Sequence, residues 1–207
     1  MTVVRPQVRP PRLPGAPAGP RRAEQRRAAL VDAAGRLFVS QGVEATTVDD
    51  IVEAAGVAKG TFYHYFRSKA DLLDALRERF CDEIMRRVGA AVAGRRPDDW
   101  PGRLDCWLTE AVHAYFDLHP LHDVAFHGSE MPLREAMGEV AIVQDLAALL
   151  AEGARAGAWA AAPPRDTAVL MFYGMHGAAD EAIVTGGSAA DVAALLRRLY
   201  AAMLRKD

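Results

Sequence analysis

Cysteines, alternating strand patterns and long apolar runs are scarce in this sequence of 207 residues. The two cysteines, Cys81 and Cys106, have no metal-ligand spacing and are too few for a disulfide framework, so a reducing cytoplasm is the simpler expectation. No run of about 18 apolar residues is present, and we therefore expect no membrane-spanning helix. The arginines near the N-terminus are not followed by an apolar segment of the kind that marks a signal peptide.

Sequence signatures of common catalytic and metal sites are also missing. There is no glycine-rich phosphate loop, nucleophile elbow or carboxylate pair with an evident partner. His119, His122, His127 and Glu130 lie within twelve residues, but their spacing matches no strong zinc signature, and Pro120 interrupts any helix they would share. We predict that the protein is not an enzyme and has no cofactor and no metal ion, with this histidine-rich segment as the open alternative for a metal.

The apolar residues recur with helical periodicity along most of the chain. No alternating β pattern and no repeat of about 20–50 residues is visible, so we predict an all-α fold. A hydrophobic content of 51% and a charged content of 25% are typical of a globular protein. The predicted helices cover approximately residues 21–41, 47–56, 58–65, 69–93, 101–118, 133–156, 166–185 and 188–204, with a short segment over 121–127.

Charge and proline are unevenly distributed. Residues 1–70 carry 11 Lys and Arg against 6 Asp and Glu, whereas residues 71–207 carry 14 against 21. A basic N-terminal third on an acidic remainder favours nucleic-acid contact. Residues 1–20 hold six of the twelve prolines and almost no large apolar group, so we expect a disordered arm. It is either a solvated leader or a basic arm that touches phosphates or the minor groove.

The most informative segment runs from Thr46 to Lys69, with the sequence TTVDDIVEAAGVAKGTFYHYFRSK. Thr47 is placed to cap a short helix, with Asp50 three residues later as its capping partner. In the second short helix Phe62 and Phe66 are four residues apart and face inward, which leaves basic, hydroxyl and aromatic groups outside. Such a helix contributes little to a core and suits a DNA backbone and groove edges.

This segment resembles the helix-turn-helix of the TetR family of transcriptional regulators, from about Arg21 to Leu76. The family pattern is G-V-S-K-G-T-L-Y-H-H-F followed by K-S-K-x-x-L, and it stands here as GVAKGTFYHYF followed by RSKADLL. The departures are conservative and fall at Ala58, Phe62, Tyr65 and Arg67. The rest of the chain resembles the family only in its length and its helical pattern.

The resemblance implies a set of DNA contacts. Thr47 would offer a hydroxyl and a helix N-terminus to a phosphate, and Lys59 and Thr61 would reach base edges in the major groove. The glycine between them would let the backbone approach closely, and the remaining residues resemble phosphate contacts. A helix-turn-helix that binds protein is the alternative. The predicted DNA-binding residues are Thr47, Lys59, Gly60, Thr61, Tyr63, His64 and Lys69.

The last two predicted helices carry a second pattern. Leu195, Leu199 and Met203 belong to a broad apolar stripe, and Gly174 and Gly177 form a small-residue face on the preceding helix, which lets helices approach closely. The resemblance implies that these helices pair with their twofold mates in a four-helix bundle. A wholly intrachain core is the alternative.

Aromatic, methionine and histidine residues gather between positions 107 and 176. For any single one of them an ordinary core position is the simpler interpretation, but the family resemblance favours an effector pocket that is mostly apolar with a few polar anchors. The predicted ligand-binding residues are Trp107, Tyr115, Phe116, His119, Phe126, Met137, Phe172, Tyr173 and His176.

We therefore expect an all-α protein with an N-terminal three-helix DNA-binding domain and a C-terminal helical domain. The expected segments are the disordered arm (1–20), the helix-turn-helix domain (21–68) and an effector-binding and dimerisation domain (69–207). The implied function is a cytoplasmic transcriptional repressor, a homodimer on a pseudo-palindromic double-stranded operator that a small-molecule effector releases. An enzyme and a protein-interaction module are the competing classes.

Overall fold

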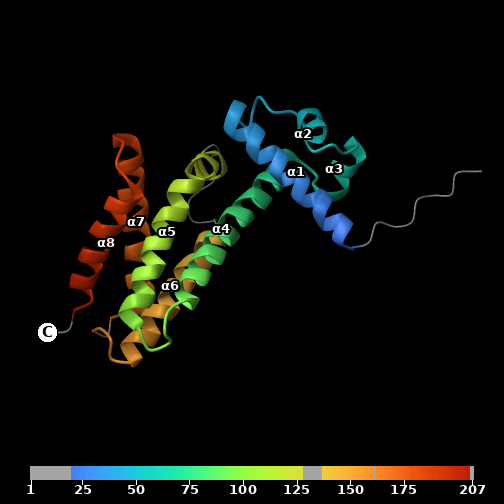
Figure 1. Ribbon diagram of the computed structural model, residues 1–207. Coiled ribbons are helices and arrows are strands. Elements are labelled where there is room, and N and C mark those ends of the chain that lie inside the picture. Colours follow the sequence, from blue (N-terminus) through green and yellow to red (C-terminus); the bar gives the residue numbers. More distant parts are fainter. Residues whose placement is uncertain (1–19, 128–136, 161, 206–207) are drawn as a thin grey trace, which may run out of the picture.

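The computed structural model describes residues 20–127, 137–160 and 162–205, so the predicted arm lies outside it apart from Pro20. In these ranges the chain forms α-helices and one π-helical turn without any strand, which confirms the all-α prediction (Figure 1). The elements are α1 (Pro20–Gln41), α2 (Val48–Ala54), α3 (Lys59–Tyr65), α4 (Lys69–Ala93), α5 (Trp100–His122), η1 (Asp123–His127), α6 (Met137–Arg155), α7 (Pro164–Thr185) and α8 (Ala189–Met203).

Local capping sets several of the helix starts. Thr47 precedes α2 and forms a complete capping box with Asp50, because each side chain bonds the backbone N–H of the other. Ser68 and Ser188 cap α4 and α8 in the same way with their hydroxyls. Gly56, after α2, has φ of 65°, a left-handed conformation that glycine adopts at no steric cost. The predicted boundaries of these short elements are therefore close to the observed ones.

The predicted end of the fifth helix before Pro120 is wrong. Helix α5 continues through Pro120 to His122 and passes into the π-helical turn η1, so the separate segment predicted over 121–127 is part of this continuation. A proline inside a helix removes one backbone hydrogen bond and crowds the carbonyl four residues earlier. At the last turn of a helix that loss is small, and a wider π-helical turn follows it.

The helices surround two apolar cores that meet along α4. The first core joins α1, α2 and α3 to residues 72–76 of α4, and we call this group the N-terminal unit. The second joins the rest of α4, from Phe80 onward, to α5, α6, α7 and α8, and we call it the helical body. Figure 1 shows the N-terminal unit at one end of α4 and the body along the other. Since α4 serves both cores, a domain boundary at residue 69 stays a prediction.

Two features tie the N-terminal unit to the body. Ala125 in η1 is fully buried in the first core, although it follows α5 in the chain. Phe126 packs against both cores, and the Arg77 side chain of α4 donates from Nε to the Ala125 carbonyl at 2.7 Å. None of the described helices is long and apolar enough to cross a membrane.

Candidate nucleic-acid interface and effector region

The recognition helix α3 turns its apolar side inward and its polar side outward. Phe62 is fully buried, whereas Tyr63 is 55% exposed. Lys59 and His64 are also exposed, and Thr61 is half-buried. At Gly60 an added Cβ would meet no atom within 4 Å, so the backbone of the first turn is open on its outer side. The predicted DNA-binding residues of α3 thus share one accessible surface.

The hydroxyl of Thr47 is already engaged in the cap of α2. It accepts a bond from the Asp50 backbone N–H at 3.1 Å and donates to Asp50 Oδ2 at 2.7 Å. The backbone N–H of Thr47 donates to the same carboxylate at 2.8 Å. These bonds hold the pKa of Asp50 below its ordinary value, the backbone bond most of all. Thr47 is therefore a capping residue, and its contact with a phosphate stays a prediction.

Lys69 has a partner set that sequence reasoning missed. Its Nζ donates to the carbonyl oxygens of Val43 at 2.8 Å and Thr46 at 2.9 Å, with that of Glu44 at 3.5 Å. An ammonium has three donors, and these contacts use them to fix the loop that leads into α2. No sequence signal marks such a role, because the acceptors are backbone atoms of a distant loop. The predicted phosphate contact of Lys69 remains untested.

Lys59 and Arg67, the other two cations between residues 42 and 69, are paired with carboxylates. Lys59 Nζ lies 2.8 Å from Asp49 Oδ1 and 3.0 Å from its Oδ2, and the hydrogen bond and charge of Asp49 raise the pKa of Lys59. Arg67 Nε lies 3.1 Å from Asp71 Oδ2. Within residues 42–69, every described Lys and Arg thus has an intrachain partner.

Further arginines lie at the start of α1, next to the end of α3. Arg21, Arg22 and Arg26 are exposed there. Arg27 lies over the ring of Phe66 at 5.4 Å from its centroid and 3.7 Å from Glu78. The contact between Arg27 and Phe66 places the second turn of α1 beside the end of α3.

Several predicted ligand-binding residues come together between α5 and α7. The Tyr115 ring lies 4.8 Å from that of His176 and 5.9 Å from that of His119. Phe172 is 4.3 Å from His176 and 5.3 Å from Tyr173. Tyr115 and Phe172 are buried, but Tyr173 is 41% exposed on α7. The prediction thus gathers residues of one neighbourhood, although it mixes buried and surface positions.

The remaining predicted ligand-binding residues lie apart from this group or connect to it indirectly. Trp107 is buried earlier on α5 and donates from Nε1 to Asp145 Oδ2 at 2.7 Å. Phe116 is half-buried against the body core, and Phe126 reaches the group through His122, on which it stacks at 4.9 Å. The side chain of Met137 lies outside the described residues.

Two residues that the ligand prediction omitted, His122 and Asp180, complete a polar cluster with Tyr115 and His176. We call it the buried polar cluster because Tyr115 and His122 are buried, whereas His176 and Asp180 are half-buried. The Tyr115 hydroxyl donates to Asp180 Oδ1 at 2.5 Å and lies 3.2 Å from His122 Nδ1. Only 5% of His122 is exposed. Residues seven apart share a helix face, so Tyr115 and His122 would have been linked had the helix been predicted to continue through Pro120.

The histidine-rich segment does not assemble as ligands where it is described. His119 Nε2 lies 3.3 Å from Asp123 Oδ1, one turn away on the same helix. Among the described residues, no three His, Cys, Asp or Glu side chains are arranged to hold a metal ion. The side chain of His127 and the whole of Glu130 lie outside the described residues, so the metal alternative is not tested there.

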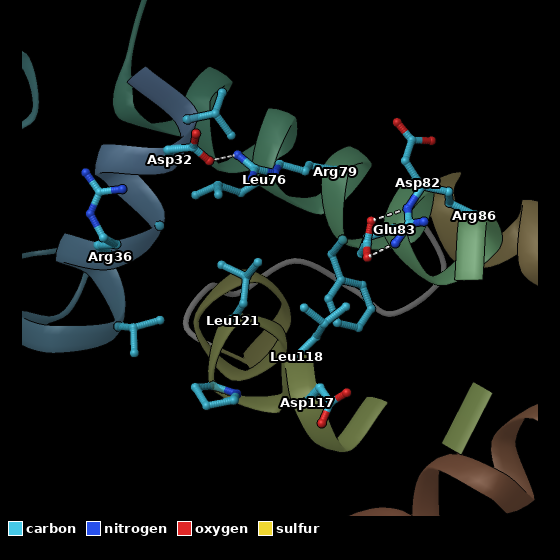
Figure 2. Close-up of a pocket in the computed structure, with 15 residues that line it drawn as sticks. Asp32, Arg36, Leu76, Arg79, Asp82, Glu83, Arg86, Asp117, Leu118 and Leu121 are labelled. Atoms are coloured by element: carbon cyan, nitrogen blue, oxygen red, sulfur yellow. Dashed lines mark hydrogen bonds and ion pairs between the residues drawn. The ribbon is translucent and has the colours of Figure 1, made fainter. Parts of the chain in front are cut away.

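A groove of about 750 Å³ lies at the junction between the N-terminal unit and the body. Figure 2 shows Leu76, Leu118 and Leu121 facing it, from α4 and α5, with the Asp32–Arg79 ion pair bridging α1 and α4 at one edge. None of the nine predicted ligand-binding residues lines this groove. No sequence pattern indicated this groove, because its walls come from three helices, α1, α4 and α5, that meet only in the fold.

Comparisons with known proteins place this geometry in a family. Residues 30–76 match the family model described as bacterial regulatory proteins, tetR family. The HTH-type transcriptional repressor KstR2 of Rhodococcus jostii is 41% identical over 68 residues, which cover 33% of this chain and 33% of that protein. The match therefore spans about a third of the length of this curated relative.

Solved structures extend the similarity to most of the chain. A transcriptional regulator of the TetR/AcrR family from Thermobifida fusca is 27% identical with a TM-score of 0.63, and the match covers 84% of this chain and 95% of that one. The regulator FadR of Bacillus subtilis, solved with stearoyl-CoA, is 20% identical with a TM-score of 0.69 and coverages of 83% and 96%. Residues 30–76 thus carry the helix-turn-helix segment of the TetR family of bacterial regulatory proteins, and the helices of most of the chain are arranged as in solved regulators of that family.

Proposed function

We propose that this protein is a DNA-binding transcriptional repressor that a small-molecule effector releases from its operator. The observation that carries the proposal is the division of α3 into a buried side, with Phe62 fully enclosed, and an open side with Lys59, Gly60 and Tyr63. A helix of this kind fits the major groove and reads base edges there. The relatives over this segment are transcription regulators, and KstR2 is a repressor. We infer no catalytic activity.

The helical body supports a homodimer through α7 and α8. On α8, Leu196 is 3% exposed, whereas Leu195 is 39% and Leu199 50% exposed, so one face packs in the chain and the sides next to it are apolar and open. On α7, Val184 is 83% exposed, and an added Cβ at Gly177 would meet no atom within 4 Å. Two such faces from twofold-related copies would pack as a four-helix bundle and place two recognition helices on successive half-sites.

The sequence predicts Gly174 on the small-residue face of the dimer, but its surroundings within the chain also require a small residue. An added Cβ there would lie 2.7 Å from the Tyr200 hydroxyl of the same chain. The small residue thus makes room for α8, and Gly177 remains the glycine of the proposed dimer face.

We place the effector at the buried polar cluster, because hydrogen-bonding groups in an apolar surrounding are the usual anchors of a ligand pocket. Binding there would favour a spacing of the recognition helices that no longer fits two successive grooves. Such coupling is typically about 1–3 kcal/mol, so the effector should lower operator affinity roughly 5- to 150-fold. The stearoyl-CoA of FadR is a property of that protein and identifies only one class of compound to include in a screen.

DNA binding is tested by selection from a random pool of duplexes with the purified protein. We expect enrichment of a pseudo-palindrome whose half-sites lie about one helical turn or somewhat more apart. Thr61→Ala should change which sequences are enriched, while Ser40→Ala, at an exposed position near the end of α1, should change nothing. Recovery of no common sequence would reject the proposed function.

The dimer is tested by light scattering with two substitutions that lie about one helical turn apart on α8. Leu199→Asp should give a folded monomer, because the position is half exposed within the chain. Leu196→Asp should unfold the body, since a buried unpaired charge costs several kcal/mol. A wild-type monomer at micromolar concentration would contradict the interface.

The effector site is tested by a thermal-shift screen, because a ligand that binds only the folded state raises its stability. A hit should release operator DNA, and Tyr115→Phe or Phe172→Ala should weaken it. If both variants bound a DNA-releasing hit as tightly as the wild type, the effector would bind elsewhere, and the junction groove would be the next site to probe.

A further inference from the structure

We propose that Asp49 is a specificity-determining residue of the DNA interface: its carboxylate holds the Lys59 ammonium and yields it only to a site whose bases accept it. This inference rests on the proposed function, because it assigns a role within the same interface. Asp49 lies in the first turn of α2, and Lys59 is the first residue of α3. The pair therefore joins the two helices of the helix-turn-helix on their outer side.

The Asp49–Lys59 ion pair is not needed to hold the fold together. Lys59 Nζ contacts both carboxylate oxygens, at 2.8 and 3.0 Å, yet the side chains of Lys59 and Asp49 are 54% and 69% exposed. The cap of α2 is complete without Asp49, because Asp50 and Thr47 form it. An exposed pair of this kind adds little to stability. Its position on the reading surface is what distinguishes it.

A lysine on a DNA-binding surface normally adds affinity for any sequence, because it releases counterions from the phosphates. When its charge is matched by a carboxylate, that general gain is lost, and the carboxylate is itself repelled by the backbone. In the major groove a lysine can instead bond guanine O6 and N7. A DNA site with such acceptors replaces the bonds between Lys59 and Asp49 with bonds to guanine. An arbitrary duplex offers Lys59 weaker replacements. The ratio of specific to non-specific affinity rises as a result.

The other cations of the helix-turn-helix sharpen this assignment. Lys69 is bound to backbone carbonyls of the loop before α2, and Arg67 is paired with Asp71, its neighbour across the start of α4. Neither lies in the first turn of the recognition helix. Lys59 thus combines a reading position with an acidic partner from a different helix.

The experiment compares Asp49→Asn with wild type on a selected operator duplex and on a scrambled duplex of equal length, over a range of salt concentrations. We expect the scrambled duplex to bind roughly 1.5- to 5-fold more tightly per half-site. The slope of log K against log salt should steepen by about one per half-site. Operator affinity should change less, so that the specificity ratio falls. Asp49→Glu, which keeps the charge, should behave as wild type.

Two controls separate a held lysine from a general charge effect. Glu83→Gln removes the same charge from an exposed ion pair with Arg86 on α4 and should leave both affinities unchanged. In a Lys59→Met background, Asp49→Asn should raise the affinity for the scrambled duplex less than it does in wild type, because only the repulsion between the carboxylate and the phosphates is then relieved. A thermal melt checks that the variants fold.

The outcomes distinguish the two levels of inference. If wild type fails to discriminate the selected duplex from the scrambled one, the proposed function fails. If wild type discriminates and Asp49→Asn discriminates equally, only the role of Asp49 is overturned. An equal gain in the Lys59→Met background, or with Glu83→Gln, would likewise overturn it, because the residue would then act only as one more negative charge.

Discussion

The cap of α2 in the N-terminal unit and the polar contacts inside the helical body differ in how far apart in the sequence their hydrogen-bonded side chains lie. The cap of α2 joins Thr47 to Asp50, three positions apart. In the body, Tyr115 donates to Asp180 across 65 positions and Trp107 to Asp145 across 38. Short-range bonds can be inferred from spacing alone, whereas long-range bonds exist only once helices have packed. The two regions are therefore stabilised by contacts of different origin, and substitutions can separate them.

The two regions also differ in what they leave exposed. The N-terminal unit presents Lys59, Tyr63 and His64 to solvent, while the body presents Leu199 and Val184. A polar, hydrogen-bonding surface suits a hydrated partner such as DNA, and an apolar helix face suits a second protein copy. This contrast supports our proposal that the two ends of the molecule bind different partners.

Phe62→Ala is expected to have the largest effect on stability. The Phe62 ring is fully buried and lies 5.9 Å from that of Phe66, and such a truncation costs about 3–5 kcal/mol. The three tryptophans, Trp100, Trp107 and Trp159, all belong to the body or contact it, so their fluorescence reports on the body, whereas circular dichroism reports on every helix. In urea, we expect the dichroism of the variant to fall before its fluorescence changes.

The control for this comparison is Tyr63→Ala, at the exposed neighbouring position, which should leave both transitions near those of wild type. Coincident transitions in Phe62→Ala would mean that the two regions unfold as one cooperative unit. The bond from Arg77 to Ala125 and the shared helix α4 would then couple the two cores strongly enough for them to unfold together.

Tyr115→Phe should rank second and act on the body. It removes the donor that Asp180 accepts at 2.5 Å, and leaving a buried polar group with one bond fewer costs about 1–3 kcal/mol. The decrease should appear in fluorescence and dichroism together, because the body contains all the tryptophans. Tyr173→Phe, at a surface position of α7, should cost less. An equal loss in the two variants would show that the buried polar cluster contributes no special stability.

Alkaline pH should weaken the body through Tyr200. Burial raises the pKa of this tyrosine from 10.0 to about 12, and its hydroxyl donates to the Met171 carbonyl at 2.8 Å. Because the folded pKa is raised, the stabilisation is complete below pH 10 and is lost as the pH rises toward 12. At pH 11 the loss should be about 1.4 kcal/mol. Urea titrations at pH 9 and 11 should show a smaller decrease in Tyr200→Phe than in wild type.

Thr47→Ala should have the smallest effect, in the N-terminal unit. The loss of a threonine cap costs about 1 kcal/mol. The substitution also removes the bond from the Thr47 hydroxyl to the Asp50 carboxylate, the smaller of the two bonds that hold the pKa of Asp50 below its ordinary value. The stabilisation from this bond is present above about pH 4 and is lost as the pH falls through the lowered pKa. The difference between wild type and variant, measured by urea unfolding, should therefore shrink in acid. A difference that persists unchanged at pH 2 would assign the effect to the hydroxyl alone.

Helix boundaries that depend on neighbouring residues were predicted well, and the end of α5 was not. The caps at Thr47, Ser68 and Ser188 and the turn at Gly56 gave the observed helix starts and stops, because each depends on residues within one turn. The prediction ended helix α5 before Pro120, because proline usually ends a helix and the sequence does not reveal the π-helical turn that follows.

The sequence by itself determined the helical class, the similarity of residues 30–76 to the TetR family and the outward-facing residues of α3, since periodicity, capping and motifs are properties of neighbouring positions. Only the tertiary structure decided that Lys69 binds the loop before α2, that Tyr115 meets His122 and Asp180, and that a groove opens where α1, α4 and α5 meet. Each of these depends on how rigid helices pack against one another, and that packing brings together residues whose separation along the chain carries no local signal.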